Sequence, residues 1–395
     1  MKLLLKLIAG IVVGITIGAI YYAAGPGGTT GAVFEFLARL FVTIESILGS
    51  FIFFMIPLII LFFIVNGITK IGEGSGRVVG ATLGTAYIST LGAGLLAYAV
   101  SMFVMPRITD GGSVPEENAE LEPFFEFEVT PLMDILTALV LAFAFGIVIT
   151  LTRSELMKKW FEEGKNIIEF LIEKAVIPIL PFYIAGVFAG MAAQGTIFDT
   201  LAVFGVVLLV AVLLHWIWIT IQYSIAGAAL GKNPAKMIKT MIPAYFTALG
   251  TMSSAATIPM TLKQTKENGI RNRIADFVVP LCANIHLSGS TITIVSCSIA
   301  VMTVLPDYDL PGFGMMLGTI LLLGIVMIAA PGVPGGAIMA ASGVLSTNLG
   351  FDESAVAFMI ALYMAQDSFG TAANITGDGA VSSVIDAYDR KRTIE

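Results

Sequence analysis

The sequence predicts an all-α polytopic membrane protein with eight transmembrane helices and two oppositely oriented re-entrant helical hairpins. Of its 395 residues, 57% are hydrophobic and only 12% are charged, whereas a soluble domain carries about 25% charged residues. Basic residues gather on alternate flanks of the apolar runs, as in a multi-pass protein. Two charge-poor runs instead have the same kind of flank at both ends, so neither is expected to cross the membrane as a simple span.

Six apolar runs in the first part of the chain are long enough to span a bilayer. They cover residues 3–24, 36–69, 79–105, 131–152, 167–194 and 199–231. The segments after the fourth and sixth runs are rich in lysine, whereas the acidic segment 106–130 is poor in basic residues. By the positive-inside rule, we expect an integral plasma (inner) membrane protein with both termini in the cytoplasm and 106–130 outside.

The run 236–263 carries basic residues at both ends, so both ends favour the cytoplasm. Its middle, Thr251-Met252-Ser253-Ser254-Ala255-Ala256-Thr257-Ile258-Pro259, is small, hydroxylated and closed by proline. This pattern predicts a re-entrant hairpin whose tip lies at membrane depth. Irregular backbone is tolerated there only against protein or a water-filled cavity. A plain span with an unusual charge pattern is the alternative.

The remainder of the chain repeats the arrangement in the opposite orientation. A span is interrupted by Pro280 and by Asn284-Ile285-His286-Leu287-Ser288-Gly289-Ser290-Thr291. An uncharged second hairpin with acidic flanks breaks at Pro331-Gly332-Val333-Pro334-Gly335-Gly336, and a final span follows. These three elements cover residues 272–304, 312–348 and 352–388. Two inverted repeats with broken elements are typical of a secondary transporter, whose site lies where the breaks converge.

The final span carries a polar stripe. At about 100° per residue, Asp367, Thr371, Asn374 and Asp378 fall within a sector of about 60° on one helix face. An ionisable residue within a membrane span costs about 2.5–3.5 kcal/mol or more, so two on one face indicate a path for an ion or a substrate. The alternatives are a helix end at a wet interface or two acids satisfied by neighbouring helices.

The chain resembles the glutamate transporter homologue family, the dicarboxylate/amino acid:cation symporters. The resemblance rests on the hairpin tip ending in Thr257-Ile258-Pro259, on Gly332-Val333-Pro334-Gly335 and on Asn374-Ile375-Thr376-Gly377-Asp378, in family order. It implies a homotrimer and an elevator mechanism. Segments 1–70 and 131–194 would form the scaffold, and 79–105 with 199–395 the transport domain.

The resemblance also implies roles for individual residues. Asp367 matches an aspartate that binds the substrate amino group, and Asn374 an asparagine that holds its α-carboxylate and amino end and lends its carbonyl to an ion. Asp378 matches a sodium-binding carboxylate. The other expected substrate-site residues are Thr371 and Gly370 on the final span, Ser253 and Ser254 at the first hairpin tip, and Gly332 and Val333 at the second.

Two departures from the family pattern stand out. Members that carry acidic substrates have an arginine where this chain has Gly370, so glutamate and aspartate are expected to be poor substrates. The family motif Asn-Met-Asp-Gly-Thr is His286-Leu287-Ser288-Gly289-Ser290 here. Together with Thr90 and Cys282, His286 and Ser288 are expected ion-site residues, and one sodium site is expected to be weakened or lost. His286 either carries a proton or is a neutral, hydrogen-bonded histidine.

The resulting expectation is a sodium-coupled symporter or exchanger of a small neutral amino acid such as serine, threonine or alanine, in contact with membrane lipid. The alternative is a proton-coupled carrier of an amino acid or dicarboxylate that uses His286. An enzyme is not expected, because Asp367 and Asp378 lie 11 residues apart, about 16 Å along a helix, too far to share a proton. We expect no cofactor other than sodium as the coupling ion and no nucleic-acid partner, since no basic patch is present.

Overall fold

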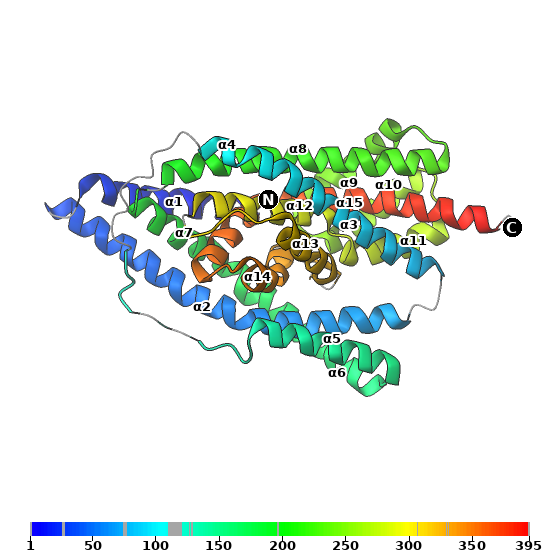
Figure 1. Ribbon diagram of the computed structural model, residues 1–395, viewed down its shortest axis with the longest axis horizontal. Helices are drawn as coiled ribbons and strands as arrows, with labels where there is room; N and C mark the ends of the chain where they lie inside the picture. Colours follow the sequence, from blue (N-terminus) through cyan, green and yellow to red (C-terminus); the bar gives the residue numbers. More distant parts are fainter. Residues whose placement is uncertain are drawn as a thin grey trace.

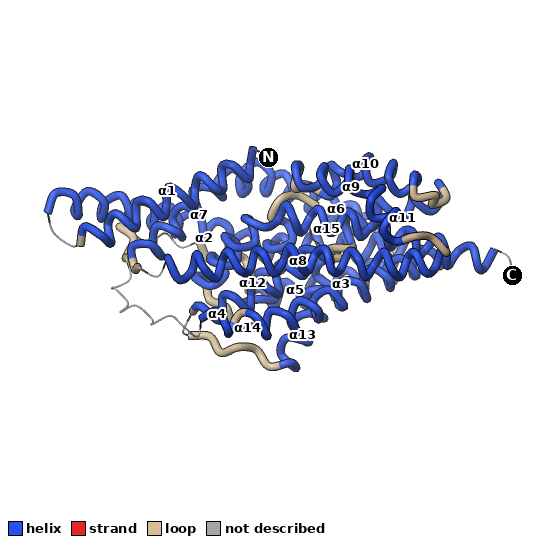
Figure 2. Tube along the Cα trace, turned by 90° about the horizontal axis from the view of Figure 1, so that it is seen from above, coloured by secondary structure: helices blue, strands red, loops and turns tan. Residues whose placement is uncertain are grey.

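The computed structural model describes residues 2–25, 28–73, 77–109, 121–125, 127, 129–195, 197–305, 307–328, 330 and 332–393. Within these residues all regular structure is helical, which confirms the predicted all-α class. Most helices run along the long axis of an elongated bundle, with α7 near one end and the C-terminal end of α15 at the other (Figure 1, Figure 2). Pro331 and most acidic residues of the 106–130 segment lie outside the described residues.

The first helices pack through small residues. Helix α1 (Lys2–Ala24) presents Gly10, Gly14 and Gly18 to α7 (Ile177–Ala193). A side chain at any of the three would collide with the backbone oxygens of α7. This spacing allows two helices to approach closely where lipid offers no hydrophobic driving force for their association.

The remaining elements of this half lie between α1 and α7 in the chain. They are α2 (Gly28–Glu73), α3 (Arg77–Val104), α4 (Pro106–Thr109), α5 (Ile135–Thr152), α6 (Glu155–Leu171) and a π-helical turn (Ile172–Val176) that leads into α7. Helix α6 is amphipathic: Phe161 and Ile168 are buried, whereas Lys159 and Glu163 are exposed.

The second half of the chain contains both long continuous helices and helices interrupted by short breaks. Its elements are α8 (Ile197–Leu230), α9 (Pro234–Thr251), α10 (Ser254–Glu267), α11 (Asn272–Ile285), α12 (Ser288–Val304), α13 (Phe313–Met327), α14 (Gly336–Leu349) and α15 (Glu353–Thr393). Helix breaks fall at 252–253 and at 286–287, inside two of the predicted segments, and between α13 and α14, where the break overlaps the predicted segment 331–336 but begins before it. The predicted interruption at Pro280 is wrong. Helix α11 continues through this proline, since a proline kinks a helix without always ending it.

Six segments among the described residues are long and apolar enough to cross a membrane. They are Leu5–Ala24, Gly28–Thr69, Arg77–Val104, Glu155–Ala193, Val203–Leu230 and Asn272–Val304. Each overlaps one of the predicted spans, although Gly28–Thr69 and Glu155–Ala193 begin well before the predicted 36–69 and 167–194. The other two predicted spans, 131–152 and 352–388, contain α5, which has 18 residues, and α15, which has 41 residues and carries the polar stripe.

Helices α12 and α15 form the centre of the molecule. Every residue of α12 from Ser288 to Met302 is buried, and α15 is buried over most of its length despite its polar residues. The last turns of α15 are tied to the α10–α11 connection, because Arg271 donates to Asp386 at 2.6 Å and to Asp389 at 2.8 Å. The hydrogen bond to Asp386 raises the pKa of the Arg271 guanidinium above its ordinary value. This end of α15 is therefore fixed by a charged network.

Candidate substrate and cation sites

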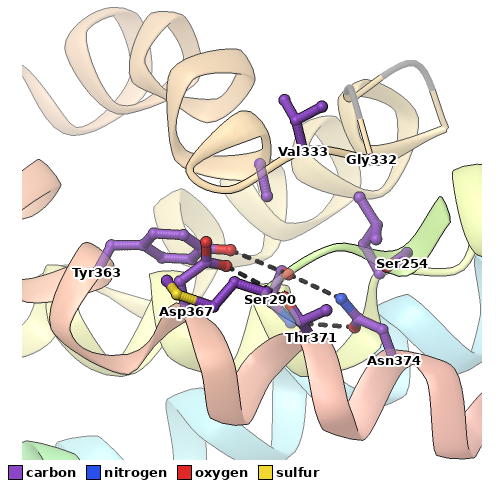
Figure 3. A pocket seen from close by; sticks show the side chains of 11 residues that line it. Ser254, Ser290, Gly332, Val333, Tyr363, Asp367, Thr371 and Asn374 are labelled. Atoms are coloured by element: carbon purple, nitrogen blue, oxygen red, sulfur yellow. Dashed lines mark hydrogen bonds between the residues drawn. The ribbon is translucent and has the colours of Figure 1, made fainter. Parts of the chain in front are cut away.

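A small cavity lies where the helix breaks converge on α15 (Figure 3). The cavity is small, with room for about one water molecule in this conformation. The lining residues are Met252, Ser254, Leu287, Ser290, Gly332, Val333, Ala337, Tyr363, Asp367, Thr371 and Asn374. Six of them are predicted substrate-site residues: Ser254, Gly332, Val333, Asp367, Thr371 and Asn374.

Asp367 forms the hydrogen-bond-accepting end of the cavity. Its Oδ2 accepts from the backbone N–H of Gly335, 2.8 Å away, at the start of α14. Gly335 has a φ of +75°, a conformation that favours glycine. The other oxygen, Oδ1, receives a long hydrogen bond from the hydroxyl of Thr371 at 3.4 Å, and the Tyr363 hydroxyl also contacts the Asp367 carboxylate. Oδ1 therefore keeps capacity to accept from an ammonium group.

Asn374 forms the donating end. Its Oδ1 accepts from the backbone N–H groups of Gly289 (2.7 Å) and Ser290 (3.2 Å), so it caps α12, whose N-cap residue Leu287 has no capping side chain. Its Nδ2 donates to the Ser290 hydroxyl at 2.9 Å, and the Tyr363 hydroxyl donates to the same atom at 3.0 Å. Because Ser290 Oγ accepts twice, its own proton is left to donate into the cavity.

The two broken helix pairs touch beside this cavity. Ser253, the N-cap of α10, donates its hydroxyl to the backbone oxygen of Gly332 at 2.9 Å. Met252 ends α9 in the left-handed conformation with a φ of +54°, uncommon for a residue with a side chain. The sequence places Ser253 and Ser254 together at the substrate. In the structure Ser254 lines the cavity, whereas Ser253 joins the two tips.

Asp378 lies in a second, sealed cluster. Its Oδ1 is 2.9 Å from Nδ1 of His286, and both side chains are fully buried. The second ring nitrogen, Nε2, is 2.8 Å from the hydroxyl of Ser89 and 3.1 Å from the amide nitrogen of Gln222. Oδ2 of Asp378 has no hydrogen-bond partner among the described residues. A buried carboxylate oxygen in this condition is suited to a cation.

The side chains of the other predicted ion-site residues form no hydrogen bond with Asp378 among the described residues. Cys282 is buried one turn before His286, and the Ser288 hydroxyl has no partner within the described part of the chain. The Thr90 hydroxyl donates to its own helix, at Ala86, and its neighbour Ser89 is the residue of α3 that contacts His286.

Gly370 does not line the cavity. A Cβ atom at this position would lie 3.3 Å from the Thr293 hydroxyl, so the glycine lets α12 pack closely against α15.

Sequence reasoning missed several site residues. They are Met252, Leu287, Ser290, Ala337 and Tyr363 at the cavity, and Ser89 and Gln222 at the sealed cluster. Only Tyr363 carried a usable signal, because it lies four residues before Asp367 and so falls on the polar face of α15. The others lie on different helices, and their partners depend on tertiary packing.

Among the described residues, no three His, Cys, Asp or Glu side chains come together as a metal-binding group. A cation at Asp378 would therefore depend on one carboxylate and neutral oxygen ligands. Hard cations bind oxygen ligands of this kind.

Comparison with known proteins gives one family and a set of distant relatives. The model of the sodium:dicarboxylate symporter family matches residues 3–388. Excitatory amino acid transporter 1 of Ambystoma tigrinum is 29% identical over 265 residues, 65% of this chain and 48% of the relative. Excitatory amino acid transporter 5 of Homo sapiens is 28% identical over 299 residues, 75% of this chain and 46% of the relative. The chain spans about half the length of these curated relatives.

Proposed function

The chain belongs to the sodium:dicarboxylate symporter family, and from this premise we propose that it carries a small neutral amino acid, such as serine, threonine or alanine, by sodium-coupled symport or exchange. Membership identifies an integral membrane transporter of a sodium-coupled family. The names of the matched relatives support an amino acid as the substrate class. The cavity supports the choice of a neutral one.

The main support for a neutral amino acid is the distribution of hydrogen-bond acceptors and donors in the cavity. Asp367 offers an acceptor at one end, and Asn374 with Ser290 offers donors at the other. This arrangement is complementary to the ammonium and carboxylate groups of a zwitterion. No lysine or arginine is among the described residues that line the cavity. A second carboxylate on the substrate would therefore be buried without a cation, which is costly.

The sealed cluster supports sodium coupling. Asp378 is fully buried, and the only hydrogen-bond partner of its carboxylate among the described residues is His286. Its Oδ2 is available to a sodium ion that travels with the substrate. The contact of His286 with Asp378 also supports the expectation that one of the family's cation sites is altered in this chain.

The arrangement of the moving parts is part of the proposal, and family membership supports it. Segments 1–70 and 131–194 form the scaffold of a homotrimer in the plasma membrane, and both termini are cytoplasmic. Segments 79–105 and 199–395 move as an elevator. The pairs α9–α10 and α13–α14 are its re-entrant hairpins, and the contact of Ser253 with Gly332 supports a shared tip region.

Uptake by the purified protein in liposomes tests the proposal. Inward sodium gradients should drive uptake of radiolabelled serine, threonine or alanine, and replacement of sodium by choline should abolish it. Aspartate and glutamate in tenfold excess should compete poorly. Full uptake without sodium, driven by a pH gradient, would instead establish the proton-coupled alternative that uses His286. Preferred uptake of aspartate would refute the neutral substrate.

A further inference from the structure

The sealed cluster around Asp378 joins four helices by side-chain hydrogen bonds. Ser89 comes from α3, Gln222 from α8, His286 from the end of α11, and Asp378 from α15. A Cβ atom at Gly377 would lie 2.8 Å from Oε1 of Gln222 and from Cε1 of His286, so this glycine lets the cluster close. None of these residues lines the substrate cavity.

The partners of His286 determine which ring nitrogen carries a proton. An ionised carboxylate only accepts hydrogen bonds, so Nδ1 donates to Oδ1 of Asp378. The amide nitrogen of Gln222 only donates, and it faces Nε2 of His286 at 3.1 Å while it also donates to the Ser89 hydroxyl at 2.8 Å. The Ser89 hydroxyl proton is then directed at Nε2, 2.8 Å away. Nε2 therefore accepts, and the ring is an uncharged Nδ1–H tautomer.

An uncharged ring has a specific consequence for Asp378. It fixes Oδ1 through one hydrogen bond but leaves the negative charge of the carboxylate in place. Oδ2 remains without a partner among the described residues. The Ser288 hydroxyl, two residues after His286 at the start of α12, is another buried oxygen without one.

We propose that His286 is a positioning residue for the coupling cation: it orients Asp378 so that Oδ2 binds sodium, and Ser89 with Gln222 fixes the ring. His286 is then neither a ligand of the ion nor a carrier of a proton. Groups that orient a metal ligand typically change metal affinity about 10- to 100-fold when removed. The inference rests on the proposed function, since it concerns the same sodium ion.

Two substitutions of His286 separate this role from general packing. In His286→Asn the amide nitrogen takes the place of Nδ1 and keeps the donor to Asp378. In His286→Gln the amide nitrogen takes the place of Nε2 and loses that donor. Positioning therefore predicts a larger loss of sodium affinity for His286→Gln than for His286→Asn, whereas a packing role predicts the reverse or no difference.

The measurement is the sodium-dependent thermal shift of the full-length protein in detergent, together with the half-saturating sodium concentration for uptake in liposomes. His286→Gln should weaken sodium binding about 10- to 100-fold, with the KM for the amino acid at saturating sodium unchanged. Ser89→Ala should weaken sodium binding about twofold to fivefold, the loss of one hydrogen bond at the low end of its usual range. Ser298→Ala is its matched control, because that buried hydroxyl bonds only to its own helix at Ile294.

The outcomes separate the inference from the function on which it rests. A wild-type protein that shows no sodium-dependent shift contradicts the proposed function itself. A wild-type protein that binds sodium, with His286→Gln and His286→Asn equally affected, overturns the inference alone. The same conclusion follows if His286→Gln leaves sodium affinity unchanged while its melting temperature without sodium stays at the wild-type value.

Discussion

Asp367 and Asp378 lie on the same face of α15, about three turns apart, yet they are held in different ways. Asp367 lines the cavity and accepts from a backbone N–H of the α13–α14 break. Asp378 is sealed among side chains and accepts from the ring of His286. Each acid is held by the protein mainly through one oxygen, and the other oxygen keeps capacity to accept from a ligand. The surroundings of that second oxygen differ between the two acids, and they favour a substrate ammonium group at Asp367 and a sodium ion at Asp378.

The difference shows how one helix can bind two kinds of cation. The spare oxygen of Asp367 faces a cavity with donors at its far end, so it suits an ammonium group that belongs to a larger zwitterion. The spare oxygen of Asp378 is buried and has no hydrogen-bond partner among the described residues, which suits a bare ion with no attached group. Substitutions of the two acids should therefore affect substrate and sodium separately.

The largest effect is expected from Asp367→Asn. The variant keeps the shape of the side chain but removes the charge that pairs with the substrate ammonium group. Loss of one partner from a buried pair costs about 3–5 kcal/mol, so amino acid affinity should fall at least about 100-fold. Calorimetric titration with serine in saturating sodium measures this loss. Sodium alone should still stabilise the variant against heat, and near-normal serine uptake would remove Asp367 from the site.

Asp378→Asn should reverse this pattern. Without the carboxylate charge, sodium affinity should fall about 10- to 100-fold, the effect of losing a charged interaction of about 1.5–3 kcal/mol. In the absence of sodium the variant should melt at a higher temperature than the wild-type protein, because a buried and uncompensated charge has been removed. Uptake measured against sodium concentration checks the first result and a thermal melt the second. Unchanged sodium dependence would place the ion elsewhere.

The comparison of the two acids also marks the limit of sequence reasoning. Their common helix face follows from spacing alone, and the helix breaks follow from glycine, proline and serine in otherwise apolar runs. The donor that holds each acid does not, because Gly335 and His286 reach α15 only through tertiary packing. Sequence spacing likewise does not predict whether Ser89 or Thr90 contacts His286, because this depends on how α3 is rotated about its axis in the folded protein.

A third prediction concerns the Asp367 end of the stripe and its missing arginine. The Thr293 hydroxyl lies 3.3 Å from where a Cβ atom of residue 370 would be, so Gly370→Arg alone should reduce uptake by displacing α12. Combined with Thr293→Ala, the arginine should improve aspartate uptake relative to serine about tenfold, the value of a charge-assisted hydrogen bond. Competition uptake measures this ratio, with Thr293→Ala alone as control. No gain in the double variant would mean that residue 370 does not reach the substrate side chain.

The smallest effect is expected from Tyr363→Phe, which keeps the ring and removes only the hydroxyl, a group that donates to Ser290 and also contacts the Asp367 carboxylate. Ser290 then accepts only from Asn374, and its own proton is less firmly directed into the cavity. One uncharged hydrogen bond contributes about 0.5–1.5 kcal/mol, so the KM for serine should rise about twofold to tenfold. The half-saturating sodium concentration should not change, because Tyr363 lies on the Asp367 side of the stripe. An equal change in both constants would show that the two acids are coupled, and that their separation along α15 does not isolate substrate from ion.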